Sequence, residues 1–372
     1  MKIAMVTADF PPNVGGVATH VAELGAALAA GGHDVRVYTS VPGDGRRRSR
    51  GRGVRIERLA LPGTRALFSR ALARALTRAL RAEPVEVLHV HGLRSLPATR
   101  RLRDLGMARR VLFTNHTSGF LQRIARGAPS ARRVGRRLTH LDGVLAPSEE
   151  LVEATRAAGY PGPVRYIPNG VDTDRFHPGS PADRLAARDT LGLPADACVV
   201  LLARRLVPKN GPRLFAESAA FLVRPDVWLL VAGDGSERGA VETILASHGM
   251  RERTRFLGSV DNDRMPEIYR AADISVLPSL EEATSIAGLE SMASGLPLVG
   301  TEVGGIPHLV RHRETGLLVP PADPRALGRA LAELVAAPEK RQVLGAAARR
   351  RAVEAFSWAR IARETLEAYR GP

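Results

Sequence analysis

The sequence predicts an α/β protein built from two Rossmann-like, doubly wound domains. The segment 2–39 reads as a strand, a glycine-containing loop, a helix and a second strand, which is the order of a parallel βαβ unit. The same alternation of short apolar runs and helical segments starts again after residue 180. A length of 372 residues also suits two hydrophobic cores better than one.

In the first half, apolar spacing at Val21, Leu24 and Leu28 predicts a helix that ends at the glycine pair 31–32. Short apolar runs predict strands at residues 2–10, 34–39, 85–92, 110–116, 143–148 and 164–172. Ligand-binding groups of such sheets gather beyond the carboxyl ends of the strands. The polar side chains expected there are His91, His116, Ser148 and Asn169.

In the second half, the same criteria predict a second parallel sheet. Its strands are expected at residues 197–206, 227–235, 253–260, 274–279, 297–305 and 315–323. Its clearest helices are expected at residues 211–222, 266–272 and 285–294. The domains are therefore expected to cover residues 1–174 and 175–355.

Positive charge is concentrated in one region of the chain. Residues 46–137 hold 24 arginines, no lysine and four acidic residues, a net charge of +20, whereas the whole chain carries +16. Such a region suits phosphates of nucleic acid, of an anionic membrane surface or of a phosphorylated substrate. An ordinary solvated surface explains it equally well. The glycine- and arginine-rich segment 43–53 is expected to be a mobile loop that the fold does not need.

Residues 64–83 have the pattern of a basic amphipathic helix. Leu67 or Phe68, Leu72, Leu76 and Leu80 share one face, and arginines occupy the other. Packing of the apolar face on the sheet is the principal expectation, because a βαβ unit requires a covering helix. Binding at a membrane interface is the alternative.

Composition points to a globular cytosolic protein. Hydrophobic residues make up 44% and charged residues 25%, and no run of 18 apolar residues occurs. The N-terminal segment is too short, and at Asp9 too acidic, for a signal peptide. Cys198, the single cysteine, lies in an apolar strand, so we expect a buried core residue rather than a nucleophile or metal ligand.

Two carboxylates flank a segment of small residues, 283–288, in the second half. A helix starting after Thr284 or Ser285 would leave the N–H groups of Ser285, Ile286 and Ala287 free to bind an anion. Glu282 precedes this helix and Glu290 lies in its second turn. Carboxylates accept hydrogen bonds from paired hydroxyls, so these two are expected to hold a sugar ring and a ribose.

Cations that could neutralise a diphosphate follow the first strand of the second half. They are Arg204, Arg205 and Lys209. Arginine binds phosphate oxygens through two parallel hydrogen bonds, and lysine adds a compact charge. Their place at a strand end favours a phosphate site over a solvated surface.

These segments resemble the retaining GT-B glycosyltransferases of family 4. The matching segments are 10–39, 85–92, 112–117, 166–178, 204–211, 229–235, 256–260, 272–305 and 315–323. They follow one another in the family's order over nearly the whole chain. The resemblance implies two Rossmann-like domains facing a cleft, the first for the acceptor and the second for a nucleotide sugar. It also implies that the final helix, about 356–372, packs back on the first domain.

The resemblance also implies roles for individual residues. Gly15 and Gly16 would close on the diphosphate, and Arg204 and Lys209 would bind its phosphates. Glu290 would bind the ribose, and the backbone near Val260 would contact the base. Glu282 and the catalytic His116 would contact the transferred sugar. Arg204 is favoured over Arg205 because its spacing to Lys209 matches the family.

No metal or other cofactor is expected. No Asp-x-Asp pair ends a strand, and His89 and His91 alternate along one strand without a third ligand. His89 or His91 is therefore expected to pack against a helix. One departure from the family is His308, which stands where a glutamate is usual. Either that glutamate is structural and replaceable, or this chain binds the sugar donor differently.

The expected activity is retaining transfer of a hexose from a UDP- or GDP-sugar to an acceptor hydroxyl. The acceptor is expected to be a lipid-linked or anionic glycan, which would place the enzyme peripherally at the inner membrane face. A nucleotide-sugar epimerase or hydrolase on the same fold is the nearer alternative. A nucleic-acid-binding protein is the more distant one, since only three aromatic residues occur between 46 and 137. A glycoside hydrolase would leave the phosphate-binding groups unexplained.

Overall fold

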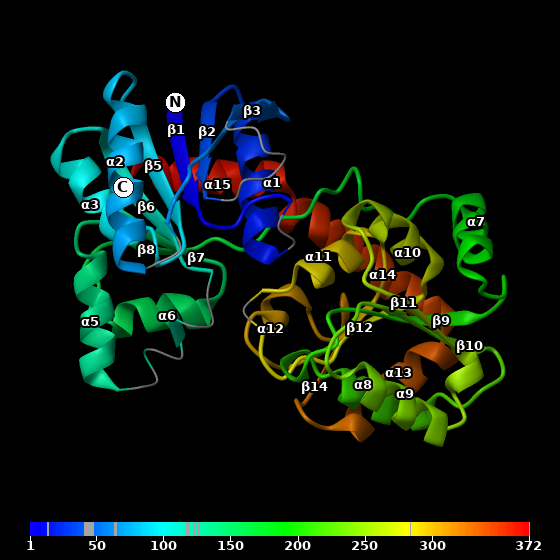
Figure 1. The fold of residues 1–372 in the computed structure, drawn as a ribbon. Helices are drawn as coiled ribbons and strands as arrows, with labels where there is room; N and C mark the ends of the chain where they lie inside the picture. The colour runs from blue at the N-terminus through cyan, green and yellow to red at the C-terminus, as the bar shows by residue number, and fades with distance from the viewer. Residues whose placement is uncertain are drawn as a thin grey trace. The chain divides into compact units, whose positions relative to one another are not determined.

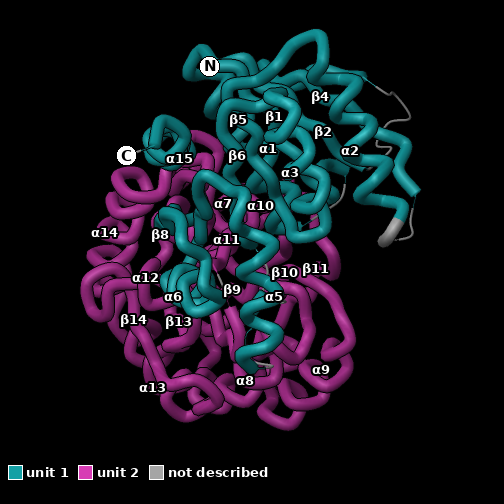
Figure 2. Tube along the Cα trace, turned by 90° about the vertical axis from the view of Figure 1, so that its left-hand side faces the viewer, with its two compact units in different colours: residues 1–170, 358–372 teal, residues 171–357 magenta. Residues whose placement is uncertain are grey.

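The computed structural model divides into two compact units, Met1–Gly170 with Trp358–Pro372, and Val171–Ser357 (Figure 2). It describes residues 1–12, 15–40, 48–62, 65–116, 120, 121, 124, 127–282 and 284–371, without the side chains of residues 65 and 66. Each unit has its own mainly parallel sheet and its own apolar core, so the predicted fold class of two doubly wound domains is confirmed.

The first unit contains an eight-stranded sheet in the order β3-β4-β2-β1-β5-β6-β7-β8 (Figure 1). Its strands are β1 (Lys2–Thr7), β2 (Asp34–Thr39), β3 (Arg48–Gly51), β4 (Val54–Arg58), β5 (Val85–His91), β6 (Ala108–Thr114), β7 (Gly143–Ala146) and β8 (Val164–Tyr166). Its helices are α1 (Gly16–Ala30), α2 (Arg65–Arg81), α3 (Leu96–Asp104), α5 (Ala128–Leu138), α6 (Glu149–Ala157) and α15 (Trp358–Arg370). The strand order changes direction between β1 and β5, which makes the carboxyl ends of these strands the expected binding edge.

The expectation of a mobile loop over 43–53 is wrong in part. Residues 48–51 form β3, an edge strand that pairs antiparallel with β4, while 41–47 lie outside the described residues. The sequence of β3 is RSRG, so no apolar alternation marks it. A polar edge strand is stabilised by its backbone hydrogen bonds and gives little sequence signal.

Helix α2 packs its apolar face into the first unit. Phe68, Leu72, Leu76 and Leu80 are buried, whereas Leu67 is 54% exposed and faces solvent. Burial inside the first unit, where α2 lies against α3, therefore accounts for the apolar stripe.

The second unit contains a six-stranded parallel sheet in the order β11-β10-β9-β12-β13-β14. Its strands are β9 (Cys198–Ala203), β10 (Val227–Ala232), β11 (Thr254–Gly258), β12 (Ile274–Leu277), β13 (Leu298–Thr301) and β14 (Gly316–Val319). Its helices are α7 (Pro181–Leu191), α8 (Pro212–Ser218), α9 (Arg238–Ser247), α10 (Met265–Ala271), α11 (Ile286–Ala293), α12 (Ile306–Leu309), α13 (Pro324–Ala336) and α14 (Pro338–Phe356). The topological switch point lies between β9 and β12, so the loops after these two strands meet there.

Among the described residues, none of the helices combines the length and the apolar character needed to cross a bilayer.

Candidate active site

Arg204 lies at the switch point of the second unit, directly after β9, and its guanidinium joins three chain segments. Its Nη1 donates to Ser279 Oγ at 3.1 Å and to Ser285 Oγ at 3.3 Å. Its Nη2 donates to Asn210 Oδ1 at 2.9 Å. The guanidinium is therefore held in place from the β12 side and from the turn after β9.

Glu282 forms an ion pair with Arg204. The Nη1 atom lies 2.5 Å from Oε2 of Glu282, and each of the two side chains is 12% exposed. The contact lacks hydrogen-bond geometry, and among described residues Oε2 of Glu282 has no hydrogen-bond partner. The attraction is thus electrostatic, and a ligand phosphate would compete with this carboxylate for Arg204.

Helix α11 begins beside Arg204, as the spacing of small residues predicts. Of the two candidate caps, Ser285 is the N-cap, and its Oγ accepts a hydrogen bond from the N–H of Gly288 at 3.1 Å. In the part of the chain that the structure describes, no group accepts from the N–H of Ile286 or Ala287. These N–H groups and the helix dipole favour an anion.

Glu290 is buried in the same helix, with 8% of its surface exposed. Tyr269 Oη donates to Oε2 of Glu290 at 3.0 Å and lies 3.1 Å from the carbonyl oxygen of Ala287. Burial, together with the carboxylate of Glu290, raises the pKa of Tyr269 well above its ordinary value. Tyr269 therefore stays protonated and orients the carboxylate of Glu290. The sequence gives no sign of this role, because Tyr269 lies in a different helix, α10.

Lys209 lies in a short 3-10 turn (Pro208–Asn210) and is exposed. Its carbonyl oxygen accepts from the N–H groups of Leu280 and Glu281 at 2.8 and 3.2 Å, which ties the turn to the loop that carries Glu282. Arg205 is exposed, so the arginine that contacts Ser285 is Arg204. Val260 lies half-buried beyond the end of β11.

A glycine loop after β13 packs on the backbone of Glu282. Gly304 has φ +51°, and a Cβ there would lie 1.5 Å from the carbonyl oxygen of Glu282. Gly305 N–H donates to the same oxygen at 3.4 Å. His308, in the short helix that follows, is exposed, and its carbonyl oxygen accepts from Arg351 Nη2 at 2.7 Å.

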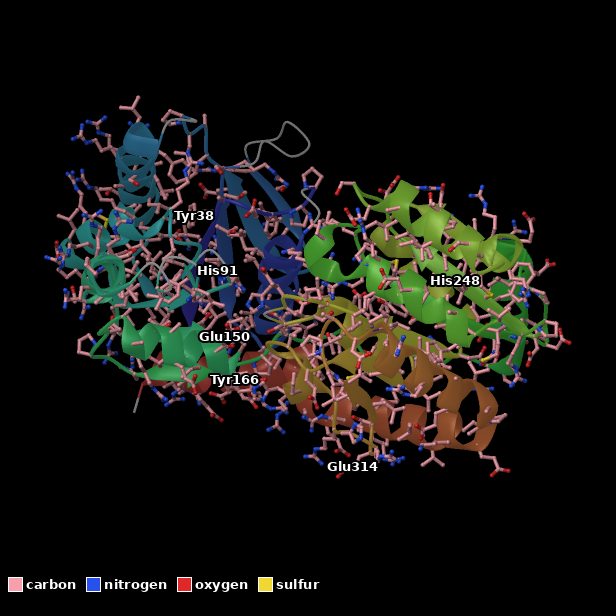
Figure 3. All side chains as sticks on the ribbon, turned by 90° about the horizontal axis from the view of Figure 1, so that it is seen from below. Tyr38, His91, Glu150, Tyr166, His248 and Glu314 are labelled. Atoms are coloured by element: carbon pink, nitrogen blue, oxygen red, sulfur yellow. The ribbon has the colours of Figure 1, made fainter. Side chains whose placement is uncertain are left out.

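A cluster of histidines lies at the binding edge of the first unit (Figure 3 labels His91). His91 Nδ1 lies 3.0 Å from His116 Nε2, and the ring centroids of His20 and His116 are 4.4 Å apart. His20 Nδ1 lies 2.7 Å from Asn169 Oδ1. His91, His116 and Asn169 are expected here from their strands, but His20 is not. Its only signal is its place one turn after the glycine pair Gly15–Gly16, which begins α1.

Burial disfavours the charged form of these imidazoles. It lowers the pKa of His20 to about 4 and the pKa of His89 to about 3, and it lowers those of His91 and His116 well below the ordinary value. The first unit therefore presents neutral rings at neutral pH. His89 packs against α15, with Nδ1 2.7 Å from Tyr369 Oη and Nε2 2.6 Å from Thr114 Oγ1.

The predicted site residues thus fall into two groups. Gly15, Gly16 and His116 belong to the first unit, and the others belong to the second. Within the second unit, Arg204, Glu282 and Ser285 are in direct contact. Their roles in binding and catalysis stay predictions.

Comparison with known proteins decides the family. Residues 183–351 match the family Glycosyl transferases group 1, and residues 14–175 match Glycosyltransferase Family 4. The chain is 30% identical over 377 residues to a D-inositol 3-phosphate glycosyltransferase of Acidothermus cellulolyticus, which covers 90% of this chain and 82% of that protein. The chain belongs to the glycosyl transferases group 1 family. Membership of a family supports the fold, whereas activity and substrates have to be argued from the site.

Other relatives and solved structures agree with this assignment. A D-inositol 3-phosphate glycosyltransferase of Saccharomonospora viridis is 38% identical over 242 residues, covering 60% of this chain but only 55% of that protein. A sucrose-phosphate synthase from Thermosynechococcus elongatus has a TM-score of 0.84 at 28% identity, with 99% of this chain and 98% of that chain covered. Anabaena Alr3699/HepE in complex with UDP has a TM-score of 0.82 at 20% identity, with 99% of each chain covered. The last likeness concerns the fold alone.

Proposed function

We propose that this glycosyltransferase transfers a hexose from a UDP- or GDP-sugar to an acceptor hydroxyl with retention of configuration. The observation that carries the proposal is the cluster at the β9/β12 switch point. There Arg204 contacts Ser285, the N-cap of α11, and Glu290 lies buried in the same helix. This combination suits a phosphate beside a ribose.

The chemistry follows from the charges that develop. Breaking the bond between the anomeric carbon and the phosphate oxygen leaves negative charge on the diphosphate. Arg204, Lys209 and the N–H groups of Ile286 and Ala287 would stabilise that charge without a divalent ion. The acceptor oxygen bonds to the anomeric carbon from the face that the diphosphate leaves, and its proton passes to the departing phosphate oxygen. No protein nucleophile is needed.

A uridine or guanosine nucleotide is the first ligand to test. Thermal unfolding would be followed with UDP, GDP and one sugar derivative of each. At about 100 times Kd, a ligand should stabilise the folded protein by about 2.7 kcal/mol. Glu290→Ala should abolish the response, whereas Glu281→Ala, an exposed neighbour of Glu282, should keep it. If neither nucleotide stabilises the wild type, the proposal is wrong.

Transfer itself requires a separate assay. The anomeric configuration of the product, followed by NMR, should match that of the donor. Consumption of the nucleotide sugar at an unchanged rate without any acceptor would instead indicate an epimerase or a hydrolase.

For the acceptor, we propose a molecule that carries phosphate. Eight arginines on α2 and α5 are exposed and have no ion-pair partner among the described residues, namely Arg70, Arg74, Arg78, Arg81, Arg132, Arg133, Arg136 and Arg137. Relatives named D-inositol 3-phosphate glycosyltransferase support a phosphorylated acceptor, since that name specifies a phosphorylated polyol.

The phosphate could belong to a free polyol phosphate or to a lipid headgroup. Flotation with neutral and with anionic vesicles separates these two sources. Because Leu72, Leu76 and Leu80 of α2 are buried, lipid binding through its arginines should be abolished by high salt. No flotation with either kind of vesicle would remove the peripheral membrane location and leave the soluble acceptor. Equal flotation with both kinds would rule out the phosphate of an anionic headgroup as the group that the arginines bind.

A further inference from the structure

Three histidines of the first unit converge, and one of them is His116, for which the family resemblance implies contact with the transferred sugar. His20 comes from α1, His91 ends β5, and His116 follows β6. Each offers one ring nitrogen, and these three nitrogens lie within 4.8 Å of one another. His20 and His91 are buried and His116 is half-buried. The strand pair His89 and His91 lacks a third ligand, but the fold brings His20 and His116 to His91.

Hydrogen bonding fixes the state of His20. Its Nδ1 faces Oδ1 of Asn169, which only accepts, so Nδ1 carries the proton and Nε2 keeps a lone pair. Nε2 is buried, and no described residue donates to it; Nε2 of His91 is buried without a partner as well. A buried nitrogen lone pair is stabilised by a hydrogen-bond donor or by a cation.

We propose that His20, His91 and His116 bind a divalent transition-metal ion of the zinc class, with a fourth position open to water or to a ligand hydroxyl. Three neutral imidazoles are a known ligand set for zinc, whereas calcium and magnesium prefer oxygen ligands, and the group contains no carboxylate. Asn169 would serve as the outer partner that holds the ring of a metal-bound histidine. Binding of the ion breaks the hydrogen bond between His91 Nδ1 and His116 Nε2, and the shared proton moves to the other nitrogen of the same ring, so all three imidazoles stay neutral.

The test uses full-length protein treated with EDTA and free of nucleotide, so it does not depend on the proposed transfer. Titration with Co²⁺ should give the visible absorption bands of a four-coordinate site, saturating at one equivalent, and Zn²⁺ should bleach them. His20→Gln should abolish the bands, and Asn169→Ala should weaken Co²⁺ binding by about 10- to 100-fold. His248→Ala, which removes a histidine of the second unit labelled in Figure 3, should change neither.

Two results would overturn the proposal. One is the absence of four-coordinate bands in the wild type, and the other is binding of unchanged affinity in His20→Gln, which would mean adventitious binding at exposed histidines. His116→Gln provides a second ligand variant at a half-buried position if His20→Gln does not fold. Zn²⁺ should raise the unfolding temperature of the wild type and not that of His116→Gln, and an equal rise in both would also contradict the site.

Discussion

Arg204 is oriented by protein groups around its guanidinium. Ser279, Ser285 and Asn210 accept its hydrogen bonds, and Glu282 balances part of its charge. A guanidinium fixed in this way does not have to be reorganised as charge develops on a leaving diphosphate. At the scale of the residue, this geometry favours arginine over any other cation.

Arg204→Lys should lower kcat/KM by about 100-fold or more. Lysine keeps the charge but cannot bridge three acceptors, and loss of one preorganised donor typically costs about 10²- to 10³-fold. Steady-state kinetics with the donor identified by thermal unfolding would measure the loss. Arg205→Lys, at the exposed neighbour, should stay within about twofold of the wild type; similar losses in both variants would argue against the assigned contact.

Cys198 illustrates the opposite case of an unreactive side chain. Burial raises the pKa of its thiol to about 11, and the side chain begins β9 in the core. A thiol-specific reagent at pH 8 should therefore react slowly with the folded protein and completely in denaturant. Rapid native labelling, as fast as that of a small free thiol, would show that the site opens.

At the scale of the element, α2 shows how an amphipathic pattern is resolved. The helix was open to two interpretations, and burial of Phe68, Leu72, Leu76 and Leu80 assigns its stripe to the protein core. Its basic face, together with the exposed Leu67, remains accessible to a partner.

Leu76→Ala should destabilise the first unit by about 2–5 kcal/mol, because a fully buried leucine leaves a cavity. Leu67→Ala, on the exposed side of the same helix, should cost less than about 0.5 kcal/mol. Urea unfolding would compare the two variants. Equal effects would mean that the face of α2 is assigned incorrectly.

The glycine loop after β13 makes a second prediction at this scale. Gly304→Ala should weaken nucleotide binding and lower stability by more than about 1 kcal/mol, since its left-handed backbone disfavours a side chain and the new Cβ meets the backbone of Glu282. Gly239→Ala in α9 has open space around it and should be neutral or stabilising by up to about 1 kcal/mol. Thermal unfolding with and without nucleotide would distinguish these outcomes.

At the scale of the whole molecule, the chain returns to its first unit at the end. Helix α15 contributes Trp358, Ile361 and Tyr369 to the core of that unit (Figure 1). The ring of Trp358 lies so close to Gly170 that a Cβ there would approach it to 2.5 Å. The first unit is therefore complete only when the last residues are present.

Deletion of residues 358–372 should unfold or loosen the first unit while the second unit, 171–357, stays folded. Loss of several buried apolar side chains removes more than the net stability of an ordinary domain. Limited proteolysis should then cleave within 1–170 and leave a fragment close to 171–357. A truncated chain with wild-type resistance throughout would contradict this view of α15.

Much of this protein could be read from local sequence signals. The strand ends, the N-cap of α11 and the spacing of Arg204 and Glu282 from neighbouring strands all depend on a few adjacent residues. Local signals failed at β3, whose polar edge has no apolar alternation, and at Leu67, where two adjacent residues competed for the apolar face. Both failures come from positions at the boundary between core and solvent.

The sequence by itself determined the two doubly wound units, because the apolar periodicity of an element and the residues that end it are local properties. Both can be recognised without knowing which elements lie side by side in the fold. Only the tertiary structure decided which distant side chains meet, such as His20 with Asn169, 149 residues apart, or Tyr269 with Glu290, 21 residues apart. The physical reason is that strand order and helix packing set these distances, and neither is written in the spacing of residues along one element.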